Sequence, residues 1–572
     1  MQQPQSWSAL AKRLPRLVSA APLLAALASC HSEPAIPEIN YLCGNQPLPE
    51  EAPGAARCGA NDPDLPPEPY GAGANWPPPD PTDPACILKA TRVTPPDGQV
   101  LDEPTGDIDT LDTQRINEAL VHCKNGVIKL AADGDKNAFL AGNLRVDSVI
   151  LWVDKGVTLF MTRNPDLMQK TGNCGVIGIN DSGACTEFIT VRGISPGIIG
   201  EGTIDGQGGE PLVGRPYSWW NMSYALREID GSIGNPTMIN TVNTTTGFLL
   251  YKITLHNSSK FHVKLTSFPN EGPDGPNGPT CTSPGKGFIV WGVTVLTPSK
   301  WFNSRGEQLT PSWARNTDGI DPGANNIAYC GVIACSTIST GDDQIAIKGG
   351  HWVENLVIAN MHFGTGHGMS IGSETYGIYT SPMPYSVVHR GVQNVKVKNL
   401  TIDADSRAVG HEAHGADFNG IRVKSDTSRG GLVKNISYEG VCLRDMVNAI
   451  LVSTAYNPLF AGDYVPEFKE LTFRDIRHVT CMALNPPVVT LEGFNETLPA
   501  GPITLDNVVI ENLGPLGVTS QFASVVMGPR DSNFHPGGST VSVDNQVTTG
   551  MQPRDCVFPV LPAPVEPAGW QH

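Results

Sequence analysis

Residues 316–368 read NTDGIDPGANNIAYCGVIACSTISTGDDQIAIKGGHWVENLVIANMHFGTGHG. Charged signatures recur in this stretch at an even spacing: Asp318 precedes Asp342 by 24 positions, and Asp343 precedes His367 by another 24. A chain that returns to one face at such a period is typical of a coil whose turns stack on each other. Because stacked strands lie about 4.8 Å apart, the spacing predicts one patch that gathers three carboxylates and an imidazole. Such a patch suits a glycosidase.

Short β-rich runs extend this pattern in both directions, and each is alternating or wholly apolar. They recur irregularly, about every 24–40 residues, and examples are residues 148–153, 248–255, 288–295, 355–358, 394–402 and 503–510. A β-sandwich would show turn signals every 8–12 residues or so, but Asn-Gly and Asp-Gly pairs between runs are few. The sequence therefore predicts an all-β, right-handed parallel β-helix of about ten coils over residues 107–545. A helix signature at residues 112–120 predicts a short N-terminal cap.

The two ends of the chain differ from this central region. Residues 1–30 have basic residues before an apolar run and close on Leu27-Ala28-Ser29-Cys30, which resembles a lipobox. We therefore expect an exported outer-membrane lipoprotein that is lipidated at Cys30 and has no other membrane attachment. Residues 31–106 are rich in Pro and Gly, which predicts a spacer, and residues 546–572 are expected to form a tail.

Cysteine content and charge limit the classes of function. Of 13 cysteines, lipidation of Cys30 would leave twelve able to pair in an oxidising compartment. The short separations of Cys174 from Cys185 and of Cys330 from Cys335 predict local disulfides, and no CxxC or Cys/His cluster indicates zinc. A net charge of −17 argues against nucleic-acid binding. A polyanionic substrate would need a local cationic groove.

Four segments in order resemble the signatures of the polygalacturonases, glycoside hydrolase family 28. They are Asn316-Thr317-Asp318, Gly341-Asp342-Asp343, Gly366-His367-Gly368 and Arg422-Val423-Lys424. Residues 200–208, Trp219-Trp220 and residues 370–373 are similar to further family stretches, and the resemblance spans about residues 107–515. It implies an inverting enzyme that hydrolyses the α-1,4 bonds of galacturonans, with no cofactor or metal. We expect a monomer.

The resemblance implies that Asp342 is the general acid, while Asp318 and Asp343 hold and activate water. Crowding by the other carboxylates is expected to raise the pKa of Asp342 and keep it protonated. Successive strand residues face opposite ways, so Asp342 and Asp343 share a cleft only if the backbone bends, which Gly341 permits. Stacking alone would bring the carboxylates closer than the roughly 6.5–9.5 Å of inverting enzymes; the inverting assignment rests on the family.

The remaining site residues concern the substrate. His367 is expected to support the acid or to contact the sugar, which its flanking glycines would allow to approach closely. Arg422 and Lys424, two apart on one strand face, would supply the cationic groove for a uronate carboxylate. The amide of Asn316 is expected to orient the substrate or an aspartate. Tyr456 stands where the family carries a tyrosine that contacts substrate.

Two apparent insertions, residues 300–315 and 374–419, flank these segments. Long loops often close one end of a cleft, so we lean towards exo-action. The second insertion contains His411-Glu412-Ala413-His414, which lacks the HExxH spacing of a zinc site.

Three alternative functions stay open: hydrolysis of a decorated pectin (rhamnogalacturonan or xylogalacturonan), a calcium-dependent pectate lyase, and a non-catalytic glycan-binding solenoid.

Overall fold

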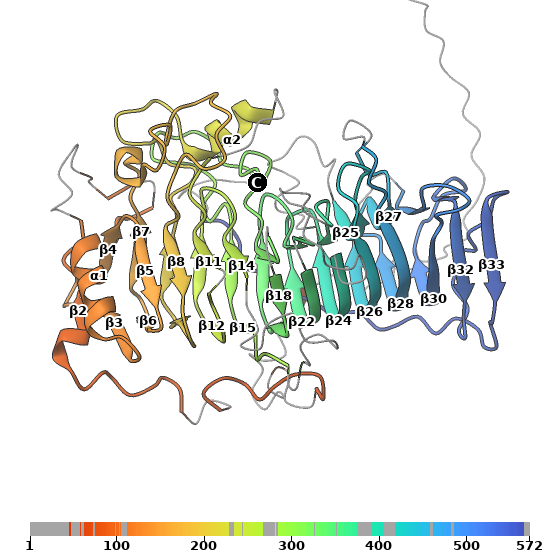
Figure 1. Cartoon of the computed structure of the whole chain (residues 1–572), viewed down its shortest axis with the longest axis horizontal. Helices are drawn as coiled ribbons and strands as arrows, with labels where there is room; N and C mark the ends of the chain where they lie inside the picture. Colours follow the sequence, from red (N-terminus) through yellow and green to blue (C-terminus); the bar gives the residue numbers. More distant parts are fainter. Residues whose placement is uncertain are drawn as a thin grey trace, which may run out of the picture. The chain divides into compact units, whose positions relative to one another are not determined.

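The computed structural model describes one compact unit of the chain, within residues 42–572. The described residues are 45–46, 58, 62–71, 75–97, 99–101, 103, 111–227, 234–242, 244–266, 281, 284–324, 327–350, 352–375, 391–404, 418–457, 462–481 and 486–565. The predicted right-handed parallel β-helix is confirmed. In Figure 1 its strands follow one another from the predicted helical cap, α1 (Thr113–His122), to β33 (Val541–Asn545).

Each full coil gives one strand to a smaller sheet, which has 11 strands among the described residues. All of its pairings are parallel, so each strand lies directly over the strand of the previous coil. In order along the sheet, these strands are β5 (Leu144–Asp147), β8 (Ile189–Arg192), β11 (Ile239–Thr241), β14 (Val263–Leu265), β17 (Ile320–Pro322), β21 (Ile345–Ile347), β23 (Met369–Ile371), β25 (Asn419–Lys424), β27 (Asn448–Ser453), β29 (Val488–Glu492) and β31 (Val518–Gln521).

The other walls of the coil form a larger sheet, with 21 strands in the described part of the chain. In the early coils a turn divides each pass into two short strands, and from β22 the pass is one long strand. In chain order these strands are β2 (Ile87–Lys89), β3 (Val127–Ala131), β4 (Ala138–Ala141), β6 (Ile150–Val153), β7 (Thr158–Met161), β9 (Gly197–Ile199), β10 (Thr203–Asp205), β12 (Phe248–Tyr251), β13 (Thr254–His256), β15 (Phe288–Trp291), β16 (Thr294–Leu296), β18 (Ile327–Tyr329), β19 (Gly331–Ala334), β20 (Thr337–Ser339), β22 (Trp352–Phe363), β24 (Gly391–Asp403), β26 (Leu432–Arg444), β28 (Glu467–Val479), β30 (Ala500–Ile510), β32 (Ala523–Met527) and β33.

The core is built from stacked apolar rows that run along the inside of the coil. In the smaller sheet, parallel register places equivalent apolar residues of successive coils on top of one another, and all of them but Val518 are buried. That row is Leu144, Ile189, Ile239, Val263, Ile320, Ile345, Met369, Ile421, Ile450, Val489 and Val518. Each coil thus buries its inner face only against its neighbours, as in other solenoids.

Asparagines stand at the bends of the long strands. Asn360, Asn394, Asn399 and Asn435 all have positive φ, a conformation that Asn tolerates better than most residues. Their side chains also stack between coils: the amide of Asn399 donates to Asn360 at 3.1 Å, and that of Asn435 to Asn394 at 2.7 Å. These ladders fix the bend of one coil over the next.

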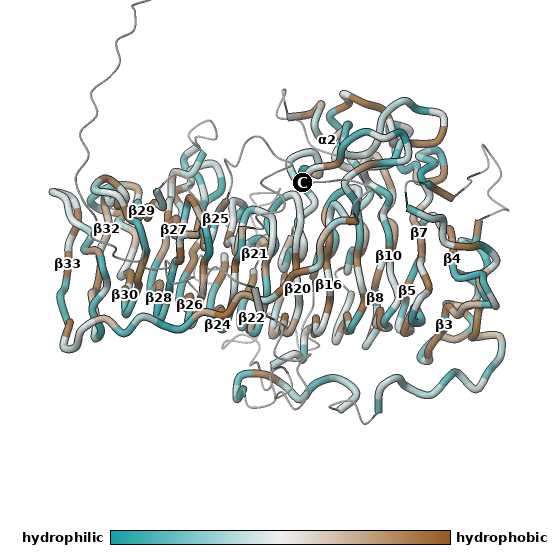
Figure 2. The backbone as a smooth tube through the Cα atoms, turned by 180° about the vertical axis from the view of Figure 1, so that it is seen from behind, coloured by the Kyte–Doolittle hydropathy of each residue, from teal (hydrophilic) through white to brown (hydrophobic). Residues whose placement is uncertain are grey.

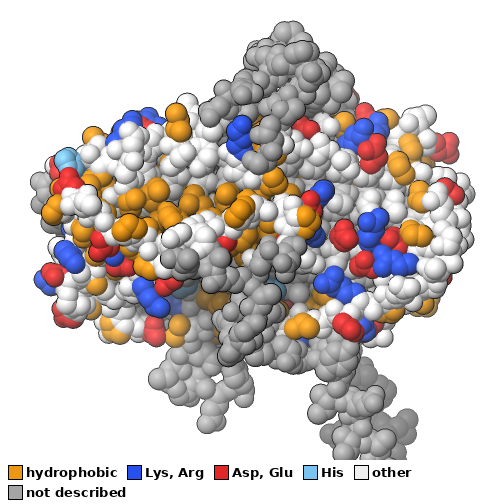
Figure 3. Space-filling view, turned by 90° about the horizontal axis from the view of Figure 1, so that it is seen from below, with side chains coloured by type: hydrophobic (Ala, Val, Ile, Leu, Met, Phe, Trp, Pro, Cys, Tyr) orange, Lys and Arg blue, Asp and Glu red, His pale blue; other side chains and the backbone are white. Residues whose placement is uncertain are grey.

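The Pro-rich segment 31–106 was expected to be a spacer, and its described part packs on the outside of the coils. Tyr70 and Trp76 pack on Tyr251, with ring centroids 5.6 and 4.8 Å from its ring. A disulfide joins Cys58 to Cys335. The larger sheet has an outward row of apolar side chains that this segment covers, and in Figure 1 the segment runs along the coils. Figure 3 shows hydrophobic side chains gathered in a broad band on this side.

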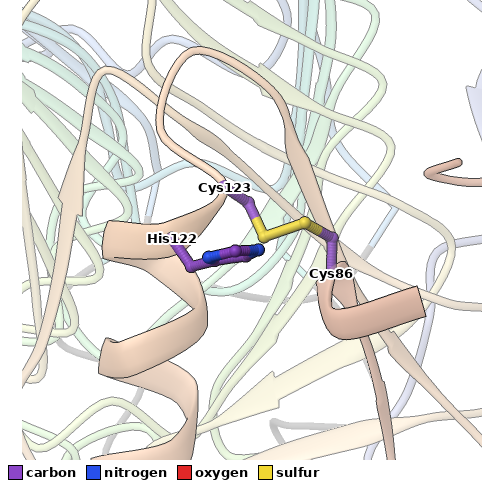
Figure 4. A group of neighbouring side chains, drawn as sticks. All are labelled: Cys86, His122 and Cys123. Carbon is purple, nitrogen blue, oxygen red and sulfur yellow. A yellow bond between two sulfur atoms is a disulfide. The ribbon is translucent and has the colours of Figure 1, made fainter. Parts of the chain in front are cut away.

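The segment ends at the helical cap, where a second disulfide joins Cys86 to Cys123. Figure 4 shows the ring of His122 beside this disulfide. Because both sulfurs are oxidised, this group of residues offers no thiolate to a metal. The nitrogen Nε2 of His122 instead lies 2.8 Å from Asp83.

Residues 546–572 were expected to be a tail, but the described part of this segment packs back along the coils (Figure 2). A disulfide joins Cys556 to Cys442, β34 (Phe558–Pro559) pairs with β1 (Asn45–Gln46), and the Val565 amide donates to the Ser299 carbonyl at 2.8 Å. Both ends of the described chain therefore stabilise the outside of the solenoid.

Of the two local disulfides predicted, one is confirmed and one is wrong. Cys174 pairs with Cys185. Cys330 pairs with Cys281 and Cys335 with Cys58. The β-helix brings together cysteines that are far apart in sequence, and short separation could not reveal this. No helix within the described residues has the length and apolar character to cross a membrane.

Candidate active site

The predicted site residues meet at the smaller sheet. They come from four successive coils, those of β17, β21, β23 and β25. Asp318 comes just before β17, Asp342 and Asp343 just before β21, and His367 just before β23. Because Ile320 pairs with Ile345, and Ile345 with Met369, the register places Asp318, Asp343 and His367 at equivalent points of successive coils. Asp318 thus stacks on Asp343, 25 positions later, and not on Asp342 as the spacing of 24 predicted, whereas Asp343 and His367 stack at the predicted spacing of 24.

The backbone bends before β21, so Asp342 and Asp343 are not in strand conformation and both can face the site. Gly341 is needed here because its backbone packs closely against other backbone atoms, and not for the bend itself, since its φ is not positive. A Cβ atom there would lie 2.3 Å from the carbonyl oxygens of Ala314 and Pro311, and the Gly341 amide donates to the Thr317 hydroxyl at 3.0 Å. Only glycine fits against the residue 300–315 loop at this point.

Asp342 is held on both carboxylate oxygens. Nδ1 of His367 lies 2.9 Å from Oδ1, the Asp343 amide donates to Oδ1 at 3.0 Å, and the Asn316 amide donates to Oδ2 at 3.0 Å. Asn316 thus contacts Asp342 through its backbone N–H and not through the side-chain amide for which the role was expected; its φ of 58° turns the backbone N–H towards Asp342.

The predicted direction of the Asp342 pKa is wrong. Burial would raise it, but the charge and hydrogen bond of His367 overcome burial and hold the pKa of Asp342 below its ordinary value. Burial likewise opposes the charge of His367, yet Asp342 raises the pKa of the imidazole. The pair is therefore aspartate with imidazolium, and its one proton resides on His367. The sequence spacing predicted that the carboxylates lie together, but it did not predict that the imidazole ring of His367 faces Asp342.

Asp343 is buried and bound by three side chains. The Ser370 hydroxyl donates to Oδ1 at 2.9 Å, Arg422 also binds Oδ1, and Nζ of Lys424 lies 3.1 Å from Oδ2. Burial opposes ionisation, but these cations lower the pKa of Asp343. The side chains of Arg422 and Lys424 are only 5% and 8% exposed, so they neutralise Asp343 rather than line an open groove as predicted.

Asp318 is buried in a different environment. Burial, followed by the charges of Asp321 and Asp342, raises the pKa of Asp318 well above its ordinary value. Its Oδ1 has no hydrogen-bond partner among the residues that the structure describes. The backbone is held from the previous coil, because the His262 amide donates to the Asp318 carbonyl at 2.8 Å.

Tyr456 joins the site as predicted. Its side chain is 40% exposed, and Nζ of Lys424 lies 5.2 Å from the ring centroid. The ring therefore presents a face at the edge of the buried charges.

The glycines around His367 have a different role from the one expected. A Cβ on Gly368 would lie 2.1 Å from the Gly420 carbonyl oxygen, and one on Gly366 would lie 2.6 Å from the Gln344 side chain. Both have positive φ. They let the neighbouring coil and the Gln344 side chain approach, and nothing in their surroundings requires a sugar.

Sequence reasoning missed several residues that complete the site: Ser370, Asp321, Lys348 and Glu374. The register places Asp321, Ser370 and Arg422 in one row across β17, β23 and β25. Because neighbouring strand residues point to opposite faces, the inward-facing Ile320 would have indicated that Asp321 points away from the core. Nζ of Lys348 lies 3.7 Å from Asp318 and 3.3 Å from Glu374.

The two apparent insertions differ from each other. Residues 300–315 form a wall packed on the loop around α2 (Trp219–Arg227), where Trp220, Leu309 and Ala314 make a buried cluster. Within residues 374–419, β24 is an ordinary strand of the coil, so this part of the range is not an insertion. The His411-Glu412-Ala413-His414 motif lies outside the described residues, as does Cys30.

One group of site residues has the spacing of a metal site: single ligand atoms of Asp342, Asp343 and His367 lie within 4.8 Å of one another. Each of these side chains already has partners of opposite charge. Nδ1 of His367 faces Asp342, and both oxygens of Asp343 face cations. The cluster is arranged for proton chemistry.

Comparisons with known proteins agree with this geometry. Residues 172–526 match the family model of Glycosyl hydrolases family 28. The chain is 31% identical to a polygalacturonase of Ralstonia nicotianae, covering 81% of this chain and 85% of that protein. It is 36% identical to an endo-polygalacturonase of Pectobacterium carotovorum subsp. carotovorum, over 69% and 83% respectively. The structure resembles the polygalacturonase of Erwinia carotovora ssp. carotovora with a TM-score of 0.53 at 28% identity, covering 79% of this chain and 97% of that one.

Proposed function

The chain belongs to glycosyl hydrolases family 28, and we propose that it hydrolyses the α-1,4 bonds between galacturonate units of pectic polysaccharide with inversion at the anomeric carbon. The observation that carries this proposal is the Asp342–His367 pair, 2.9 Å apart, beside the bound carboxylate of Asp343. A glycosidase needs one group that donates a proton and another that activates water. The relatives' names supply the substrate class.

The acid is the Asp342–His367 pair acting together. In the free protein the proton is on Nδ1 of His367 and hydrogen-bonds to Oδ1 of Asp342. As the glycosidic bond breaks, the proton of His367 moves to Asp342 and from Asp342 to the leaving oxygen, which leaves Asp342 as a carboxylate and His367 neutral. The pair therefore supplies one proton for each bond cleaved and regains it from water after the step.

The base side of the site is formed by Asp318 and Asp343. Both oxygens of Asp343 are bound by cations and a hydroxyl, so this carboxylate is a poor nucleophile and supports attack by water, which gives inversion. Asp318 accepts the proton of that water. Its raised pKa makes it a stronger base, with the proton affinity suited to catalysis near its working pH.

The substrate contacts residues at the edge of these buried charges. Tyr456 offers an exposed aromatic face, which suits one side of a sugar ring. Arg422 and Lys424 together carry one positive charge more than Asp343 neutralises, and this excess charge beside the Tyr456 ring gives a positive potential for a uronate carboxylate. This local charge offsets the repulsion that a chain with net charge −17 exerts on a polyuronate.

The mode of cleavage is a finer part of the proposal. The wall at residues 300–315 supports exo-action, in which one end of the cleft is closed. One observation favours the alternative of chain-internal cleavage: a relative at 36% identity is named endo-polygalacturonase. The two modes differ in the size of the first products.

The test is incubation of the purified protein with polygalacturonic acid, following new reducing ends and the ultraviolet absorbance of unsaturated uronates together. We expect reducing ends without absorbance. Early accumulation of monomer or dimer would mean exo-action, and a ladder of oligomers endo-action. Rising absorbance would mean a lyase. If neither reducing ends nor absorbance increased, galacturonan hydrolysis would be contradicted and decorated pectins would be assayed next.

We further propose that the chain is exported and anchored through lipid on Cys30. The disulfides of the described part of the chain support an oxidising compartment. In a bacterial host, the wild type should fractionate with membranes and incorporate labelled palmitate. The Cys30→Ser variant should lose both properties, and an unchanged distribution would contradict anchoring.

A further inference from the structure

Lys348 connects three coils beside the base side of the site. It follows β21 directly, and its amide donates to the Pro322 carbonyl at 2.9 Å, which fixes it against β17. Its Nζ lies 3.7 Å from Oδ2 of Asp318 and 3.3 Å from Oε2 of Glu374 on the following coil. The side chain is only 17% exposed. A lysine so placed is held between fixed partners.

The cations of the site are distributed among its carboxylates. His367 pairs with Asp342, and Arg422 and Lys424 pair with Asp343. Within the described part of the chain, Lys348 is the cation within 4 Å of Asp318. Asp321, on the same strand segment, is fully buried, and neither of its carboxylate oxygens has a hydrogen-bond partner among the described residues.

The other charged and titratable groups that face this cluster come from every neighbouring coil. They are Lys260, His262 and Lys264 from the coil of β14, Asp321 from β17, Asp342 and Asp343 from the coil of β21, His367 and Glu374 around β23, and Arg422, Lys424 and Arg429 from β25 and its following turn. Of these, His262 is neutral, because burial lowers its pKa to about 4.

We propose that Lys348 is a positioning residue for hydrolysis: its ammonium favours the ionised form of Asp318 next to Asp321, so that Asp318 can accept the proton of the attacking water. This rests on the proposed function, in which Asp318 is the base. Glu374 holds the ammonium from the other side, and Arg429, 3.8 Å from Glu374, extends the chain of alternating charges. Proton acceptance is thus tuned by a residue that does not itself react.

The direction of the effect follows from the charges. Burial and the charges of Asp321 and Asp342 raise the pKa of Asp318, and Lys348 opposes them. Removing the ammonium raises that pKa further, so Asp318 becomes protonated, and unable to accept a proton, over a wider acidic range. The acidic limb of the pH–rate profile therefore moves to higher pH, and the loss of activity shrinks as pH rises.

The experiment compares kcat/KM on polygalacturonate across pH for wild type, Lys348→Met and Lys348→Arg. We expect the acidic limb of Lys348→Met to move up by about 1–3 pH units and that of Lys348→Arg to return towards wild type. Lys129→Met is the matched control, because Lys129 is similarly buried between Asp80 and Asp154 on the larger sheet; its profile should not move. A uniform loss at every pH would mean a structural role and overturn the proposal.

A second variant keeps the test decisive if Lys348→Met does not fold. Asp321→Asn removes a charge that raises the pKa of Asp318, so its acidic limb should move to lower pH. An unmoved or upward limb would contradict the charge arrangement proposed here. If the wild type is active and the Lys348 and Asp321 variants keep its pH–rate profile, this inference alone is overturned. If the wild type releases no reducing ends, the proposed function is overturned, and this inference with it.

Discussion

Asp342→Asn is expected to lower kcat on polygalacturonate by about 10²–10⁴-fold, the range for loss of a general acid. Asparagine has the shape of aspartate, and its one carbonyl oxygen can still accept a hydrogen bond from His367, whereas its NH2 group cannot accept from the Asn316 amide. It cannot relay a proton to the leaving oxygen. KM should stay close to the wild-type value, because Asp342 acts on the breaking bond in the transition state. Initial rates of reducing-end release at saturating substrate measure the effect.

The control for this variant is Asp506→Asn. Asp506 is also buried, and it is bound by Arg530 in the last coils, far along the chain from the site. That variant should keep its kcat even if its thermal midpoint falls. If Asp342→Asn kept wild-type kcat, the acid would have to be another group, and Asp318, the catalytic carboxyl whose pKa is raised, would take its place.

The sequence predicted which coil carries each catalytic residue but not how the side chains pair. A recurring period is a property of the coil, so the coils of Asp318, of the Asp342–Asp343 pair and of His367 could be predicted, but the stacking of Asp318 on Asp343, 25 positions later, could not. The direction in which the imidazole turns depends on the bend at Gly341 and on local sterics that spacing does not contain. This is why the pKa of Asp342 was predicted with the wrong sign.

The ends of the chain were harder to predict for a related reason. Pro and Gly content indicates a segment that cannot form a core of its own, but it does not exclude one that packs on another surface. Tyr70 and Trp76 were the available signal, since aromatic residues in a true spacer would be exposed. Their partner Tyr251 lies on β12, far along the chain, and the pairing of Cys58 with Cys335 spans 277 residues. Such contacts depend on the finished coil.

The missed residue Lys348 shows a limit of reading motifs. It stands five positions after Asp343, in a stretch that reads as plain strand. Its importance comes from the three coils that meet there, where it lies between Asp318 of one coil and Glu374 of another. The site of a solenoid is assembled from several coils. A residue that follows a strand can therefore contribute to the site as much as a residue of the signature segments.

The second large effect is expected for Arg422→Met, which should lower the free energy of unfolding at pH 7 by about 3–5 kcal/mol, the usual loss when one partner of a buried ion pair is removed. Asp343 would keep Ser370 and Lys424 but lose its strongest partner. Arg192→Met is the matched control, because Arg192 forms an ion pair with Asp147 at 3.0 Å but is 55% exposed. That variant should lose less than about 1 kcal/mol. Urea denaturation of both variants measures the difference.

The pH dependence and a double variant identify the cause of this loss. Because the cations lower the pKa of Asp343 in the folded protein, its stabilising effect is present above the unfolded pKa of about 3.9 and is lost as pH falls through the lower folded value. The gap between wild type and Arg422→Met should therefore be full at neutral pH and close on acidification below about pH 4. Adding Asp343→Asn to Arg422→Met removes the uncompensated charge and should restore stability without restoring activity. A gap that is independent of pH, or a double variant no more stable than the single one, would mean that Arg422 stabilises the site by packing and that the charge of Asp343 is compensated by Lys424 alone.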